Sequence, residues 1–298
     1  MMSGNIAHID NQLRHSQPLI ILGMHRSGTS LAVRLLTGLG LHMGNHLSRD
    51  AEAIFFQKLN RHIFNVVGVK WGYIDPLVES MQSEQFIADQ SQFLRRELFG
   101  TRRFFSKEIK ISEFFGPTVW NEFKNNGVGP WGWKDPRSTI TFPIWLKIFP
   151  DARVLHLLRN GIDVAISTHR RSLKQQRNLF KRTFPLDFEP VTLDFNYCFD
   201  LWESYVAFVL DHKLLIPDDH YLEIRYEDLL SEPERQLRLI ADFTAFPIQD
   251  EQLKKVVRQV DRSRLDNSVF ASDYQQQIPA LVSNPLMQQL GYSYLMEN

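Results

Sequence analysis

Three short apolar runs interrupt an otherwise mixed sequence. They cover Leu19 to Leu22, Val154 to Leu158 and Tyr221 to Tyr226, and each is typical of a buried β-strand. A helix-like pattern follows each run, over Thr29 to Leu39 after the first and Gly161 to Leu173 after the second. Because strands that alternate with helices form parallel sheets covered on both faces, the pattern predicts an α/β fold.

Two other regions show helical periodicity without a strand signal. Between about residues 41 and 126 the apolar residues include Phe86, Ile87, Phe93, Leu94 and Leu98, which predicts a helical insertion. A turn-forming stretch, Asn125 to Pro130, follows it. Farther along, the three- and four-residue steps that link Phe195, Phe199, Trp202, Val206 and Val209 predict a long amphipathic helix. No repeat and no linker divides the chain, so we expect one domain over residues 1–298.

Composition narrows the class of protein. The 298 residues are 43% hydrophobic and 12% aromatic, which is enough for a sizeable core. Since 34 basic residues balance 34 acidic ones, we expect neither a nucleic acid nor an anionic membrane as partner, and any anion site must be local. The single cysteine, Cys198, the start without a signal-type apolar core and the lack of a membrane-length apolar run favour a soluble, cytoplasmic protein.

The sequence Gly23-Met24-His25-Arg26-Ser27-Gly28-Thr29-Ser30 lies between the first strand and its helix. Its glycines have the spacing of the phosphate-binding loop G-x-x-x-x-G-K-[ST], but Thr29 stands where that loop has its lysine. Backbone N–H groups at such a helix start form an anion site, and Arg26 could supply the missing cation. The alternative is a turn in which Ser and Thr only cap the helix.

This loop resembles the one by which sulfotransferases hold the 5′-phosphosulfate of 3′-phosphoadenosine 5′-phosphosulfate (PAPS), where an Arg or Lys precedes Ser-Gly-Thr. Three further stretches extend the resemblance in the family's order: Trp131 to Arg137 (WGWKDPR), Val154 to Ser167 (VLHLLRNGIDVAIS) and Leu222 to Leu229 (LEIRYEDL). The resemblance implies a three-layer sandwich with a central, mostly parallel sheet, like that of P-loop NTPases. It also implies PAPS as co-substrate, adenosine 3′,5′-bisphosphate as product and no required metal.

The resemblance assigns the donor site by position. It implies that the loop residues contact the phosphosulfate, and that a strand-end arginine and a helix serine read the 3′-phosphate; the residues are His25, Arg26, Ser27, Gly28, Thr29, Ser30, Arg159 and Ser167. The alternatives are an Arg159 that merely pairs with Asp163 and a Ser167 that faces solvent. The late segment Arg262-Ser263-Arg264 is a further candidate for the 3′-phosphate.

Catalysis requires charge stabilisation and a general base. The resemblance implies Arg26 and Lys134 as the charge stabilisers, with a salt bridge from Lys134 to Asp135 as the alternative. Hormone-type members have a base histidine two positions beyond this lysine, where this chain has Pro136. Protein-tyrosine and heparan-type members have a glutamate after the loop, and Glu52, eight residues before Asn60, matches it best. Glu52 could instead be a helix-start glutamate; the other candidate bases are His25, His42, His46 and Asp50.

The sequence does not identify the acceptor. A hydroxyl or an amine of a small molecule, carbohydrate, lipid or peptide would serve, and the insertion would lie on the acceptor side. Helix-spaced Phe and Trp residues between 53 and 123 could line an apolar pocket or form core, and the basic run from His169 to Lys174, with Arg177, Lys181 and Arg182, could attract an anion or form a solvated face.

Other functions and the assembly also stay open. The functional alternatives are an ATP- or GTP-dependent small-molecule kinase with a degenerate loop and a non-catalytic nucleotide-binding protein. The oligomeric state, a homodimer included, is not fixed by the sequence.

Overall fold

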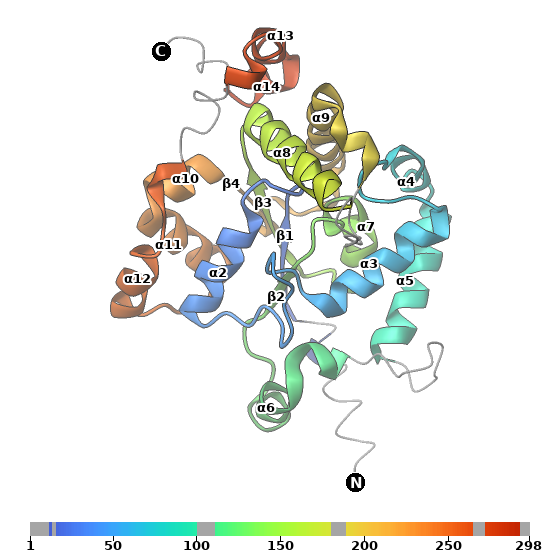
Figure 1. The fold of residues 1–298 in the computed structure, drawn as a ribbon. Coiled ribbons are helices and arrows are strands. Elements are labelled where there is room, and N and C mark those ends of the chain that lie inside the picture. Colours follow the sequence, from blue (N-terminus) through green and yellow to red (C-terminus); the bar gives the residue numbers. More distant parts are fainter. Residues whose placement is uncertain (1–11, 14–15, 100–110, 180–188, 265–271, 293–298) are drawn as a thin grey trace.

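A parallel sheet forms the centre of the structure, a computed structural model that describes residues 12–13, 16–99, 111–179, 189–264 and 272–292. Within these residues the sheet has four strands, β1 (Leu19–Leu22), β2 (Gly132–Lys134), β3 (Arg153–Leu158) and β4 (Tyr221–Arg225). Their order is β2-β1-β3-β4, and all neighbours run parallel (Figure 1). The three predicted strands are therefore confirmed, and the carboxyl ends of all four strands meet at one edge.

Helices cover both faces of this sheet. Side chains alternate across a strand, so Leu19 and Ile21 pack on one face while Ile20 and Leu22 pack on the other. The first face is covered by α2 (Thr29–Leu39), α11 (Pro233–Phe243) and α12 (Asp250–Val257), and the second by α7 (Ser138–Ile148), α8 (Gly161–Leu179) and α9 (Phe195–His212). Figure 1 shows the resulting layers. The three-layer α/β prediction is confirmed.

Within residues 54–99 and 111–126 the predicted insertion is largely helical. It contains α3 (Ile54–Val67), α4 (Asp75–Ser80), α5 (Glu84–Phe99) and α6 (Ile111–Asn126), and Gly116 interrupts α6 with a φ of 71°. Its aromatic rings join the main core: Phe56, for example, stacks on Trp133 with ring centroids 4.0 Å apart. Of the two interpretations of these rings, core is confirmed: the described Phe and Trp rings belong to the main core or pack against it.

The segment 41–53, expected as part of the helical insertion, is instead a series of turns. His42 forms an isolated bridge with Trp131, and Leu47 forms one with Ala53. The first bridge ties the segment to the residue before β2, and the second joins two residues within the segment; both take the place of helical hydrogen bonds.

Shorter elements complete the described chain. They are α10 (Tyr226–Ser231), α13 (Ile278–Val282), α14 (Pro285–Gln289) and the 3₁₀ turns Pro190–Leu193, Lys213–Leu215, Asp218–His220, Arg262–Arg264 and Ser272–Tyr274. None of the helices in the described ranges combines the length and the apolar content that a bilayer span requires.

A buried asparagine ties the insertion to the turn that follows β2. Asn60, on α3, donates from Nδ2 to Asp135 at 2.8 Å and to Ser138 at 2.9 Å. Its Oδ1 accepts from Thr141 at 2.7 Å and from Trp145 at 2.8 Å. Because the side chain is fully buried and all four bonds are made, Asn60 fixes the distance between the start of α3 and the Lys134 strand end.

Replacing Asn60 should therefore destabilise the whole domain. Asn60→Ala leaves buried partners, one of them the Asp135 carboxylate, without a hydrogen bond, and we expect a loss of about 3 kcal/mol in the free energy of unfolding. Urea titration followed by circular dichroism measures it. Asn65→Ala, at an exposed position on the same helix, should change stability by less than about 0.5 kcal/mol. Equal losses in the two variants would contradict the role given to the network.

Candidate active site

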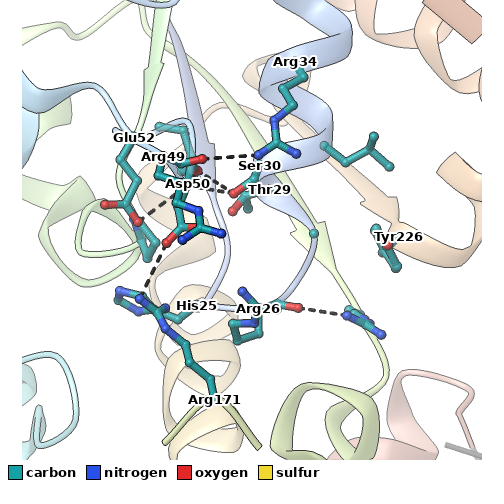
Figure 2. A pocket seen from close by; sticks show the side chains of 15 residues that line it. His25, Arg26, Thr29, Ser30, Arg34, Arg49, Asp50, Glu52, Arg171 and Tyr226 are labelled. Atoms are coloured by element: carbon teal, nitrogen blue, oxygen red, sulfur yellow. Dashed lines mark hydrogen bonds and ion pairs between the residues drawn. The ribbon is translucent and has the colours of Figure 1, made fainter. Parts of the chain in front are cut away.

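A cavity of about 320 Å³ opens at the carboxyl edge of the sheet. Figure 2 shows its side chains, with Arg34 reaching in from one side and Arg171 from the opposite side. The lining comes from the loop after β1, α2, the turn before α3, the ends of β2 and β3, α8 and α10: His25, Arg26, Gly28, Thr29, Ser30, Leu31, Arg34, Arg49, Asp50, Glu52, Lys134, Pro136, Arg159, Arg171 and Tyr226.

The loop after β1 adopts a conformation that suits glycine at its critical position. Gly28 has a φ of 93°, and a Cβ placed on it would lie 2.1 Å from the Tyr226 ring. Arg26 has a φ of 74°, which is unusual for a residue with a side chain and is typical of strained functional loops. Gly28 thus lets an aromatic ring from the end of β4 pack directly on the loop.

The hydroxyls of the loop have different partners. Ser27 is buried and donates to the carbonyl of Met24 at 2.7 Å, so its side chain holds the loop together and does not line the cavity. Ser30 Oγ lines the cavity and donates to the backbone carbonyl of Asp50. Thr29 is buried but also contributes to the lining.

That Asp50 carbonyl has a second donor. Lys134 Nζ lies 2.8 Å from the same oxygen, so one backbone carbonyl accepts from both groups. The carbonyl belongs to a tight turn in which Ser48 N donates to the Glu52 carbonyl at 2.9 Å. Ala51, inside the turn, has a φ of 55°, which is strained for alanine. The strained turn thus places the Asp50 carbonyl oxygen against the Ser30 hydroxyl and the Lys134 ammonium. An oxygen of a bound anion at this position would accept from the same two groups.

Lys134 and Glu52 form a buried pair. Lys134 Nζ lies 3.7 Å from Glu52 Oε1, and Gln57 donates to Glu52 Oε2 at 2.6 Å. Burial raises the pKa of Glu52, and the Lys134 charge opposes that rise. Burial likewise lowers the pKa of Lys134, against the effect of Glu52. The alternative partner, Asp135, instead pairs with Arg137 at 3.1 Å.

Arg159 joins the mid-chain motif to the loop. Its Nη1 donates to the Arg26 carbonyl at 3.0 Å, and its guanidinium lies 4.7 Å from the centroid of the Tyr226 ring. The pairing with Asp163, the alternative considered from sequence, is also formed, at 3.1 Å. Arg159 nevertheless lines the cavity, so this ion pair and a ligand contact are compatible.

A second cavity, of about 790 Å³, adjoins the first along α8. Arg159 and Ser167 both line it, and Arg26 Nε donates to Ser167 Oγ at 2.9 Å. The two cavities share Arg26, Arg49, Asp50, Arg159, Arg171 and Tyr226. The structure therefore brings the loop and the Arg159/Ser167 pair to one continuous region. Arg262 lines a separate depression beside Glu232 and Val257.

The candidate bases are placed differently. His25 is 7% exposed and lies 4.3 Å from the Trp71 ring, and among the described residues its Nδ1 has no hydrogen-bond partner. Burial lowers its pKa well below the usual value, and nearby Arg137 acts in the same direction, so the ring is neutral. His42 contacts the carbonyl of Phe114 at 3.2 Å and is not part of the lining.

The remaining two candidate bases, His46 and Asp50, also differ in their position relative to the cavities. His46 is exposed beside Asn45 and lines neither cavity. Asp50 lines both cavities, but its carboxylate pairs with Arg171 at 3.5 Å. Asp50 is thus engaged with a cation from α8, while Glu52 lies beside the Lys134 ammonium.

Part of the cavity lining is not predicted from the sequence. Arg34 and Arg49 were not singled out, although Arg34 follows Ser30 by one helical turn and so shares its face of α2. Tyr226 is part of the LEIRYEDL stretch. Its packing on Gly28 depends on the pairing of β4 with β3, which the sequence does not reveal. Across the described ranges, His, Cys, Asp and Glu side chains do not gather in threes as a metal site would need.

Comparison with known proteins agrees with this geometry. A model of the sulfotransferase family matches residues 18–250, so most of the chain is covered. The chain belongs to the sulfotransferase family.

Individual relatives are distant. An uncharacterized protein of Aquifex aeolicus (strain VF5) is 22% identical over 247 residues, which are 80% of this chain and 26% of that protein. Protein-tyrosine sulfotransferase A of Caenorhabditis elegans is 28% identical over 124 residues, 40% of this chain and 28% of that protein. The chain thus spans about a quarter of the length of these curated relatives.

A solved structure supports the fold. The mouse sulfotransferase SULT7A1, crystallised in complex with PAP, superposes with a TM-score of 0.50 at 12% identity, covering 99% of this chain and 94% of that chain. At that identity the likeness bears on the fold alone.

Proposed function

We propose that this protein is a PAPS-dependent sulfotransferase that transfers a sulfuryl group to a hydroxyl or an amine. The observation that carries the proposal is the joined cavity in which the loop, the Lys134/Glu52 pair and Arg159 meet. Family membership supports a sulfuryl-transfer activity, and the chemistry of the residues around the cavity supports PAPS as the donor.

The residues present fit an adenosine nucleotide with anionic groups at both ends. At one end are the backbone of the loop, Ser30, Thr29 and the Lys134 ammonium, which would hold the 5′-phosphosulfate. At the other are Arg159 and Ser167, which would hold the 3′-phosphate. The Asp50 carbonyl supports this fit, because it already accepts from Ser30 and Lys134 as a sulfuryl or phosphoryl oxygen would.

Transfer moves the sulfuryl group in line between two oxygens, or from oxygen to nitrogen. A bond forms from the acceptor atom to sulfur, the bond from sulfur to the bridging phosphate oxygen breaks, and adenosine 3′,5′-bisphosphate leaves. Arg26 and Lys134 supply positive charge where negative charge develops on the leaving phosphate. Since both cations are fixed by the loop and by the end of β2, little reorganisation accompanies the reaction.

Glu52 is the general base in this proposal. It removes the proton of the acceptor hydroxyl or amine as the new bond forms. Its pKa is raised by burial, which makes it a stronger base than an exposed glutamate, and the Lys134 charge opposes that rise. Gln57 holds Oε2, which leaves Oε1 oriented toward the ammonium and the cavity.

Binding of adenosine 3′,5′-bisphosphate tests the donor assignment directly. The nucleotide should raise the free energy of unfolding by about 2.7 kcal/mol at a hundredfold excess over its Kd, and ATP should bind more weakly. Arg159→Ala should reduce the preference for the bisphosphate over adenosine 5′-monophosphate about tenfold, because a charge-assisted contact is lost. Calorimetric titration measures both, with the exposed Arg177→Ala on the same helix as control. Tighter binding of ATP would instead indicate a kinase.

Replacement of the base should separate catalysis from binding. Glu52→Gln keeps the side-chain shape but not the basicity, so we expect kcat to fall about a hundredfold or more. The Kd for adenosine 3′,5′-bisphosphate should stay within about twofold, because the base does not contact the nucleotide in this proposal. Transfer from labelled PAPS to an acceptor panel gives kcat, with the exposed Glu113→Gln as control. An unchanged kcat would exclude Glu52 as base.

The turn around Asp50 should oppose donor binding. Because its carbonyl occupies Ser30 and Lys134, the sulfuryl group must displace it. Ala51→Gly relaxes the positive φ of the donor-free turn and so stabilises this conformation, which the donor must displace, by about 1 kcal/mol; PAPS binding should therefore weaken about fivefold.

A matched control exists for this substitution. Ala245 also has a positive φ, of 49°, and lies after α11 outside both cavities. Ala245→Gly should leave PAPS affinity unchanged in the same fluorescence or calorimetric assay. Unchanged or tighter binding by Ala51→Gly would show that the turn keeps its conformation when the donor binds.

A further inference from the structure

One face of α8 is basic along the second cavity. Ser167, Arg170, Arg171 and Lys174 recur at three- and four-residue steps, which places them on the same side of the helix. Arg26, Arg49 and Arg159 contribute three more guanidinium groups to the same cavity. The whole chain has a net charge of zero, so this concentration of cations is local.

The acidic residues of the cavity are already neutralised. Asp50 pairs with Arg171 at 3.5 Å, and Asp163 pairs with Arg159 at 3.1 Å. Lys174 and Arg49 have no carboxylate within salt-bridge distance in the part of the chain that the structure describes. Two cations therefore remain available at the wall of a cavity.

The proposed donor does not account for these two cations. Arg159 and Ser167 suffice for the 3′-phosphate, and Arg26, Lys134 and the loop serve the phosphosulfate. Lys174 lies two helical turns beyond Ser167, and Arg49 comes from the opposite wall, next to the turn that carries Glu52. Both line the cavity of about 790 Å³.

Among the described residues, the lining of the second cavity offers little surface to an apolar acceptor. Ile166 is the only aliphatic side chain in the lining of the second cavity, and Tyr226 the only aromatic one, among the described residues. The described aromatic rings of the insertion that could have formed an apolar pocket are packed in the core. A polar, negatively charged molecule is the chemical class that the lining suits.

We infer that the acceptor is anionic: it carries a carboxylate, phosphate or sulfate that Lys174 and Arg49 bind while its hydroxyl or amine faces Glu52. This inference rests on the proposed function. The anionic group takes no part in the bond changes and serves to orient the acceptor. Arg170 is a weaker candidate for this role, because its guanidinium lies over the Tyr274 ring, 5.6 Å from the centroid. Lys181 and Arg182 lie outside the described residues.

The first test measures anion binding without knowledge of the acceptor. Protein saturated with adenosine 3′,5′-bisphosphate is titrated with inorganic pyrophosphate in a calorimeter. We expect binding to this complex, weakened about tenfold by Lys174→Gln and by Arg49→Gln. Arg177→Gln, an exposed cation of the same helix outside both cavities, should bind like wild type. The nucleotide affinity should stay within about twofold in all variants.

Two results would overturn the inference. One is a nucleotide complex that does not bind pyrophosphate at all. The other is binding that is equal in wild type, Lys174→Gln and Arg49→Gln, which would place the anion elsewhere, for example in the vacated sulfuryl position beside Lys134. Failure of adenosine 3′,5′-bisphosphate itself to bind would contradict the proposed function. The calorimetric titration with this nucleotide alone measures that separately.

The second test uses matched acceptors that differ only in charge. Glucose, glucuronate, glucose 6-phosphate and glucose 6-sulfate are compared in transfer from PAPS, and tyrosine peptides with and without flanking acidic residues form a second set. Within a set, anionic members should have a kcat/KM about tenfold higher, and Lys174→Gln should remove that difference. Comparison of glucuronate, glucose 6-phosphate and glucose 6-sulfate distinguishes recognition of a carboxylate, a phosphate and a sulfate. A preference for neutral members would contradict the inference even if sulfuryl transfer itself were demonstrated.

Discussion

A buried ammonium group determines how the site is built. Lys134 is 2% exposed, and a charge removed from water is costly unless polar partners replace the lost hydration. Its partners come from two other segments: the Asp50 carbonyl and the Glu52 carboxylate belong to the turn before α3, and the Ser30 hydroxyl, at 3.4 Å, belongs to the start of α2. Stabilising this one cation therefore requires that the loop, the turn before α3 and the end of β2 stay together.

The same arrangement accounts for the turn with the positive φ. The Asp50 carbonyl oxygen satisfies the Lys134 ammonium and the Ser30 hydroxyl while no anion is bound. The strain at Ala51 keeps this interaction from becoming too favourable, because part of its energy is offset by the backbone conformation. The turn also carries Glu52, so in the proposed function a displacement of the Asp50 carbonyl would also affect the orientation of the base.

The sequence predicted the parts of the fold that depend on local pattern. The strands at 19–22, 154–158 and 221–226 and the helix at 29–39 were found because their periodicity and the loop glycines are local signals. The turns over 41–53 were not, because their bridges to Trp131 and within the segment depend on tertiary contacts. Likewise Glu52, Lys134 and Arg159 could be nominated from motifs, whereas the contributions of Arg49, Arg34 and Tyr226 depend on how distant segments pack.

Strand register explains how the loop can lack its lysine. In a nucleotide-binding loop of the usual kind the cation follows the second glycine, where this chain has Thr29. Here β2 lies beside β1 with Lys134 opposite Ile21, two residues before the loop begins at Gly23. A neighbouring parallel strand can thus deliver an ammonium to the same edge of the sheet. Because that ammonium is anchored in the sheet and paired with Glu52, a single strand register positions both groups to which the proposed function assigns charge stabilisation and proton removal.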